Sequence, residues 1–309
     1  MGRPPPSLPR ARWCCNVARA QQRPPQPLHS NRATEAHRLY SAPVQGCAAL
    51  AVDEVGTALT RSTPSSAPGP DMTPNSVWKR IHQLALHLIH ELLAPLLANG
   101  FHHPALEMAD SIVLDKLVKP SNDSPSSFRV ILLLQTISKI LQRIRNSRLS
   151  CVACLAGLLN PHQCGSLAGL SVSDATTTLA HTLRTLEMAG NTVSTLFLDI
   201  KSGFDTVDPS ALCSMLKVKA VNPYLISRTR SSLTAMTCQL SYQWSPKAFA
   251  PVSVPTPQGS PVSPLLFVIY VSRLHCEIPQ GRTLSYFNDF GLTVSSTSDR
   301  HNIQSLQRH

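Results

Sequence analysis

The chain carries the stretch Phe197-Leu198-Asp199-Ile200-Lys201-Ser202-Gly203-Phe204-Asp205, in which one acid interrupts an apolar run. β-Branched residues extend this run upstream, and the pattern predicts a buried strand over residues 193–200 that ends in a polar turn. A carboxylate inside such a strand is costly unless it is paired or bound to a metal ion. Asp199 therefore needs a partner elsewhere in the sequence.

A candidate partner lies near the C-terminus, in the sequence Tyr286-Phe287-Asn288-Asp289-Phe290. Strand-like runs over residues 283–287 and 290–294 flank Asn288 and Asp289, which predicts a hairpin with these two residues as its turn. Each acid alone is explained more simply as a capping or turn residue. Together, in a basic protein, Asp199 and Asp289 favour a two-metal phosphoryl-transfer centre in which carboxylates hold Mg²⁺.

Composition limits the class of protein. The 309 residues include 28 Lys and Arg against 17 Asp and Glu, a net charge of +11 that favours a polyanionic partner such as nucleic acid. Nine cysteines show no framework spacing, and no apolar stretch suits a signal peptide or a membrane span. We therefore expect an intracellular protein with reduced thiols and no membrane association.

Residues 1–72 are rich in Pro, Arg, Ala and Ser and contain no acid before Glu35. Such a segment cannot bury enough apolar surface to offset its ordering entropy, so we expect a disordered arm. An Arg-rich, acid-poor start is also typical of a mitochondrial transit peptide, although its prolines oppose the amphipathic helix that such a peptide needs. Order is predicted from Thr73 and Pro74, which begin a helix with the apolar stripe Val77, Ile81, Leu84, Leu88, Leu92 and Leu96.

Further elements follow at short intervals. The patterns predict a helix from Asn222, helices over residues 136–149, 173–190, 208–219 and 263–271, and strands over residues 112–114, 128–134, 237–244 and 249–254. With the hairpin, this order predicts an α+β fold with helices on one face of an antiparallel sheet.

The helix predicted over residues 136–149 is basic, because it carries Lys139, Arg143, Arg145 and Arg148 away from its apolar side. The simpler interpretation is a solvated charged face. The alternative is a surface that contacts a phosphate backbone.

Three motifs in this order resemble the palm of reverse transcriptases from non-LTR (LINE-type) retrotransposons. They are residues 197–205, the sequence Thr256-Pro257-Gln258-Gly259-Ser260-Pro261-Val262-Ser263-Pro264-Leu265-Leu266-Phe267, and residues 286–290. The likeness extends upstream to residues 128–131, 138–141 and 163–166, and it covers about 75–309. It implies a reverse transcriptase-like domain over residues 73–309, with fingers over about 73–190 and a partial palm over about 191–309.

The resemblance implies a metal-dependent polymerase centre. Asp199 would be the ligand shared by two ions, Mg²⁺ or Mn²⁺, while the carbonyl of Ile200 would face one ion and Asp289 would lie beside them. The implied substrates are deoxynucleotides, with an RNA template and a DNA primer as partners.

The resemblance also implies a nucleotide pocket. Phe204 would lie under the sugar and exclude a 2′-hydroxyl, although a core position explains this residue equally well. Gln258 and Gly259 would line the nucleotide and template pocket, where glycine permits close approach of the backbone. Arg129 would be a fingers cation near the phosphates.

Two departures from the family pattern set the functional expectation. Asn288 stands where the family has the essential first carboxylate of the third motif, and a neutral amide with one oxygen binds Mg²⁺ poorly. The sequence ends at His309, so we expect that the thumb is absent.

One hypothesis is an impaired RNA-directed DNA polymerase, in the nucleus if it is functional; the acid-poor start keeps the mitochondrion as an alternative location. The other hypothesis is a catalytically inactive, nucleic-acid-binding remnant of a decayed element.

Overall fold

The computed structural model describes residues 49–98, 103–116, 127–167, 170–234, 236–242, 245–251, 256–275 and 282–308. Residues 1–48 of the predicted arm lie outside these ranges. The expectation of disorder is wrong for residues 49–72, because helix α3 (Val52–Thr60) buries Val55 and Leu59 in a hydrophobic core. The surrounding Pro- and Ser-rich composition hid this short amphipathic helix from the sequence prediction.

Helices α4 (Asn75–Leu84) and α5 (Leu86–Ala98) replace the single helix predicted after Thr73. The chain breaks at Ala85, whose φ of −148° is not helical, and the two axes differ by 114°. The predicted stripe is only partly right: Ile81 and Leu96 pack against the core, but Leu84, Leu88 and Leu92 are exposed. The buried residues of α5 are instead Ile89, Leu93 and Leu97. Since α5 is apolar on nearly all sides, helical spacing alone could not select the buried face.

In the described part of the chain, no single helix is long and apolar enough to cross a membrane. The helices α4 and α5 have that length and composition only when they are taken together as a bent pair.

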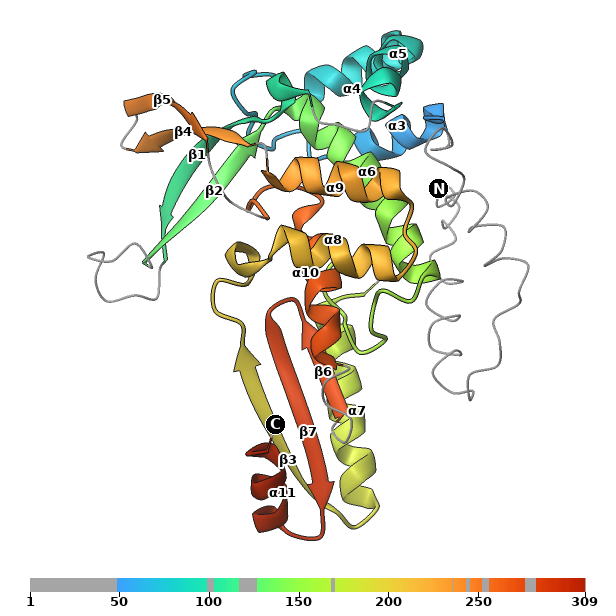
Figure 1. Ribbon diagram of the computed structural model, residues 1–309, viewed down its shortest axis with the longest axis vertical. Coiled ribbons are helices and arrows are strands. Elements are labelled where there is room, and N and C mark those ends of the chain that lie inside the picture. The colour runs from blue at the N-terminus through green and yellow to red at the C-terminus, as the bar shows by residue number, and fades with distance from the viewer. Residues whose placement is uncertain are drawn as a thin grey trace, which may run out of the picture.

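Helix α6 (Thr136–Leu155) runs through the centre of the molecule, from α3 and α5 toward α8 (Pro209–Val218) in Figure 1. Both interpretations are wrong for Lys139, Arg145 and Arg148, which are all buried, whereas Arg143 is half-buried and leaves them open. Burying a cation is costly unless protein groups replace its water. Lys139 meets this requirement by donating to the carbonyl of Ala67 at 2.6 Å.

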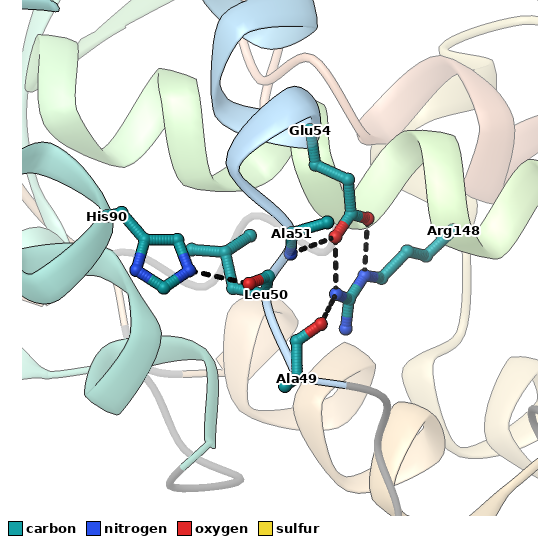
Figure 2. Close-up of polar contacts among 6 residues, drawn as sticks. All are labelled: Ala49, Leu50, Ala51, Glu54, His90 and Arg148. Atoms are coloured by element: carbon teal, nitrogen blue, oxygen red, sulfur yellow. Dashed lines mark hydrogen bonds and ion pairs between the residues drawn. The ribbon is translucent and has the colours of Figure 1, made fainter. Parts of the chain in front are cut away.

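Arg148 holds the start of the described chain on α6, as Figure 2 shows. Its Nε and Nη2 donate to the two carboxylate oxygens of Glu54 at 2.7 and 2.6 Å, and Nη2 also reaches the carbonyl of Ala49 at 3.2 Å. Nearby, Nε2 of His90 lies 2.6 Å from the carbonyl of Leu50. Burial acts to raise the pKa of Glu54, but hydrogen bonds from Arg148 and Ala51 outweigh it and hold this pKa below its usual value.

The upper sheet has the strand order β2 (Phe128–Leu134), β1 (Met108–Asp115), β4 (Thr237–Tyr242), β5 (Ser245–Pro251). The outer pairs are antiparallel, whereas β1 and β4 are parallel. The α+β class is therefore confirmed, but this sheet is mixed and not antiparallel throughout. Strands β4 and β5 come from the segment assigned to the palm and join β1 and β2, so the boundary near residue 190 stays a prediction.

The lower sheet has the order β3 (Thr192–Asp199), β7 (Asp289–Ser296), β6 (Arg282–Tyr286), all antiparallel. Helix α7 (Val172–Met188) packs beside it, and α11 (Asp299–Leu306) closes its far end (Figure 1). The prediction of a buried β3 is wrong, because Phe197 is 69% exposed. β3 is at the sheet edge, and Gly291 opposite Phe197 has no side chain with which to cover it.

The core between the two sheets is built by α8, α9 (Pro223–Thr234) and α10 (Ser263–Val271). Asp208 caps α8 as predicted, accepting from the backbone N–H of Ser210 at 2.8 Å. Single-turn helices in the described residues include η1 (Pro104–Leu106), η3 (Gly203–Thr206) and η4 (Ser272–His275). Of these, η3 lies between β3 and α8, and η4 follows α10.

We predict that Arg148→Met lowers the free energy of unfolding by about 2 to 3 kcal/mol, because it leaves the partly buried Glu54 carboxylate without its cation. The measurement is urea unfolding followed by far-ultraviolet circular dichroism, with the m-value unchanged. Arg184→Met on the exposed side of α7 is the matched control and should change stability by less than about 0.5 kcal/mol. Equal effects of the two substitutions would contradict the role given to Arg148.

Candidate functional site

The ladder between β3 and β7 ends at the two acids singled out in the sequence. Asp199 is the register partner of Asp289, and Asp289 pairs with Tyr286 across the hairpin. The turn is therefore formed by Phe287 and Asn288, one residue earlier than predicted, and Asp289 begins β7. Phe287 has a φ of 55°, so the turn takes a left-handed conformation at a residue other than glycine.

Asn288 contacts the first motif with both its side chain and its backbone. Its Nδ2 donates to Oδ1 of Asp199 at 2.5 Å, and its carbonyl accepts from the N–H of Ile200 at 3.0 Å. Asp199 is exposed, so the burial cost invoked for it does not arise. Its partner in the structure is an amide, and this contact could not be foreseen from either motif alone.

Gly203 brings the first motif close to the other two. A Cβ at this position would lie 2.8 Å from the ring of Phe267 and 3.7 Å from Cβ of Asn288. The rings of Phe204 and Phe267 have centroids 5.1 Å apart, and the hydroxyl of Thr256 donates to the carbonyl of Phe204. Phe204 therefore packs on the core, while its contact with a sugar stays a prediction.

The loop of the second motif is fixed against β2 and α6. The carbonyl of Gln258 accepts from the N–H of Leu132 at 2.7 Å, and a Cβ on Gly259 would lie 2.2 Å from the Leu132 oxygen. Gly259 also has a φ of 115°, which only glycine adopts readily. Ser260 donates to Oε1 of Gln142 at 2.5 Å. Glycine is thus required by the protein's own backbone, and contact of Gln258 and Gly259 with a nucleotide stays a prediction.

The structure brings most of the predicted site residues together. Asp199, Asn288 and Asp289 meet at the hairpin tip, and Phe204 joins them to the loop of Gln258 and Gly259 through Thr256 and Gly203. Arg129 is exposed on β2, three positions before Leu132. Its proximity to phosphates stays a prediction.

A buried polar network behind the hairpin was not predicted. The carbonyl of His162 accepts from the N–H of Ser285 at 2.9 Å, and the Ser285 hydroxyl donates to Oε1 of Gln163. His275 joins these groups, with Nε2 2.7 Å from the Ser285 hydroxyl and Nδ1 2.7 Å from the Thr283 hydroxyl. A hydroxyl that donates to Gln163 must accept from Nε2–H of His275, so Nδ1 accepts from Thr283.

The segment that carries this network packs directly against the turn at Phe287 and Asn288. A Cβ at Gly165 would lie 2.5 Å from the backbone nitrogen of Phe287, so the loop that carries Gln163 lies directly against the turn. Gln163 and Gly165 belong to one of the upstream segments of resemblance. Burial, with the nearby His162, lowers the pKa of His275 to about 4. The imidazole is therefore neutral near pH 7, as the network requires.

The donor set does not fit a two-metal centre. Such a centre needs several hard oxygen ligands around its ions. In the described ranges, no group of three or more His, Cys, Asp or Glu side chains gathers where it could hold a metal ion. At the hairpin tip only Asp199 and Asp289 are carboxylates, and the amide nitrogen of Asn288 already occupies one oxygen of Asp199.

Comparison with known proteins agrees with the three motifs. The family described as reverse transcriptase (RNA-dependent DNA polymerase) matches residues 117–309, more than half of the chain. In Drosophila melanogaster, the probable RNA-directed DNA polymerase from transposon X-element is 25% identical over 70% of this chain and 24% of its own length. The probable RNA-directed DNA polymerase from transposon BS is 25% identical over 84% of this chain and 29% of its own length. The RNA-directed DNA polymerase from mobile element jockey is 24% identical over 75% of this chain and 25% of its own length. The chain thus spans about a quarter of the length of these relatives.

We predict that the His275 network contributes less stability as the pH is lowered from about 6.5 to 4. The folded-state pKa of His275 is depressed to about 4, so the unfolded chain binds this proton more readily in the window, at a cost of about 2 kcal/mol once solvent screening is allowed for. Glu107 acts in the opposite direction, because burial raises its folded-state pKa to about 7. Urea unfolding at a series of pH values therefore compares two slopes, and the destabilisation on lowering the pH should be smaller in His275→Gln than in the wild type. The exposed His181 provides the control, His181→Gln, which should leave the slope unchanged. A wild-type slope in His275→Gln would refute the assignment.

Proposed function

The chain belongs to the reverse transcriptase family, and we propose that it is an RNA-directed DNA polymerase module whose nucleotidyl transfer is impaired at Asn288. The observation that carries the proposal is the hydrogen bond from Asn288 to Asp199 at the tip of the β3–β7 ladder. The resemblance to LINE-type retrotransposon enzymes is confirmed by the family match and by relatives named as transposon polymerases.

The arrangement of the three sequence motifs supports the proposal that the chain is a polymerase module. Three sequence motifs that are far apart in the chain converge through the contacts of Gly203, Phe204 and Asn288. On this basis the substrates are deoxynucleotides, copied from an RNA template onto a DNA primer. Phe204 would then face the sugar, and Gln258 with Arg129 would face the base pair and the phosphates.

The metal-ligand residues at the site support the proposal that nucleotidyl transfer is impaired. Polymerases of this kind transfer nucleotides with divalent ions that stabilise the attacking and leaving oxygens. In this chain Asp199 and Asp289, with the carbonyl of Ile200, would be the remaining ligands for Mg²⁺ or Mn²⁺, and beside the neutral amide of Asn288 they would hold such an ion only weakly. Replacement of a third carboxylate by an amide removes a charge and a ligand oxygen, and loss of a group that acts in the transition state slows such reactions by about a thousandfold or more.

A second candidate function is nucleic-acid binding without catalysis, and the net charge of +11 favours it. Exposed cations such as Arg129 and Lys201 lie on elements of the candidate site. In a protein of this kind, affinity falls steeply as salt rises, because bound cations are released from the phosphate backbone. If the polymerase is functional, we propose the nucleus as its location, because chromosomal targets are found there, with the mitochondrion as the alternative.

We predict that Asn288→Asp raises primer extension on an RNA template by at least about a hundredfold, because it restores a charged ligand oxygen. The assay uses a labelled DNA primer with Mg²⁺ or Mn²⁺, and Asp199→Ala in the Asn288→Asp background should abolish the gain. Asn191→Asp, at the other end of β3, is the matched control for an added charge and should leave extension unchanged. Wild-type extension as fast as that of Asn288→Asp, and dependent on Asp199, would overturn the proposal.

A further inference from the structure

We infer that the amide of Asn288 acts as a metal-independent latch, which fastens the tip of the β6–β7 hairpin to the end of β3 without a divalent ion. The inference rests on the proposed function only for the identity of the site, because it concerns what holds that site together. It follows from the mismatch between the donor set and a two-metal centre.

Electrostatics at the tip show why a latch is needed. Asp199 and Asp289 are register partners, and residues paired in this way in an antiparallel ladder have Cα atoms about 5 Å apart. Two carboxylates at this separation repel each other unless a cation or a hydrogen-bond donor lies between the strands. The Nδ2 group of Asn288 supplies a donor to one of the two carboxylates, since it lies 2.5 Å from Oδ1 of Asp199.

The surroundings aim this amide at Asp199. The backbone carbonyl of Asn288 is held by the N–H of Ile200 at 3.0 Å, and the left-handed Phe287 before it directs the chain back toward β3. On the other side, Gly203 lies against the ring of Phe267, and a Cβ at position 203 would be in ordinary van der Waals contact, 3.7 Å, with Cβ of Asn288. The protein's own backbone contacts therefore hold Asn288 where its amide reaches Asp199.

An aspartate at position 288 would have the same shape and keep the same backbone contacts. It would replace the donor by a third carboxylate beside Asp199 and Asp289, so the tip would need a cation to stay closed. In the wild type the hairpin tip is held by a hydrogen bond and needs no metal ion, whereas in Asn288→Asp it would be held only when a divalent ion is bound. The stability of the variant, unlike that of the wild type, should then depend on divalent ions.

Thermal unfolding of the full chain tests the latch without any catalytic readout. The wild type, Asn288→Asp and Asn288→Ala are each melted in EDTA and in saturating MgCl₂, with NaCl added to equalise ionic strength. We expect the same Tm for the wild type in both solutions. We expect Asn288→Asp to melt about 2 to 4 °C lower in EDTA and to recover in MgCl₂, because ligands that bind only the folded state raise Tm.

Asn288→Ala separates loss of the latch from added repulsion, and it covers the case in which Asn288→Asp does not fold. Its Tm should fall by about 1 to 3 °C equally in EDTA and in MgCl₂. Asn191→Asp controls for an added charge and should show no response to Mg²⁺. The inference is overturned if wild-type Tm rises with MgCl₂ and this rise disappears in Asp199→Ala, or if Asn288→Ala melts with the wild type. Because no outcome depends on primer extension, failure of the latch and failure of the proposed function are distinguishable.

Discussion

The pairing of β3 with β7 is the constraint on which the site depends. Because side chains alternate along a strand, a slip of one residue would turn Asp199 and Asp289 to opposite faces of the sheet. The register is fixed at the far end, where Asn302 donates to the carbonyl of Thr192 at 2.9 Å, and in the middle, where the hydroxyls of Thr195 and Thr293 are 3.1 Å apart. The hydrogen bonds of Asn288 fix it at the tip. The β3–β7 ladder therefore sets the relative positions of Asp199, Asn288 and Asp289, and the loops of the other motifs pack around them.

Helix α6 supplies the second constraint, because it belongs to both large hydrophobic cores. Ile140 and Ile144 pack with α3 and α5, whereas Leu149 and Val152 pack with α8 and α10. Between these two stretches the helix carries buried cations, and Gln142 bonds to the loop of the second motif. Helix α6 therefore links the helices α3 and α5 to the loop of the second motif, because it contacts both. This explains why a basic helix is buried here: its charges are used within the protein and not at its surface.

The sequence allowed the site to be predicted better than the packing. The order of the three motifs led correctly to Asp199, Asn288 and Asp289 as neighbours, and capping signals such as Asp208 placed helices within a residue or two. Burial was predicted poorly, because an apolar run does not tell an edge strand such as β3 from a central one. The basic face of α6 failed for a related reason: the partners of Arg148 and Lys139 lie in residues 49–72, which composition alone had marked as disordered. The network at His275 joins three separated segments, and only the fold brings them together.

We propose that the candidate site of this chain carries a hydrogen-bond donor, Asn288, where the reverse transcriptase motif has a metal ligand. Titration of Mn²⁺, followed by electron paramagnetic resonance of the free ion, tests it most directly in the wild type, Asn288→Asp and the Asp199→Ala variant of each. The account predicts that the wild type removes no more Mn²⁺ from solution than its Asp199→Ala variant. It also predicts that Asn288→Asp binds Mn²⁺ saturably and loses this binding with Asp199. Saturable binding by the wild type that is as tight as in Asn288→Asp, and that disappears with Asp199, would contradict the account.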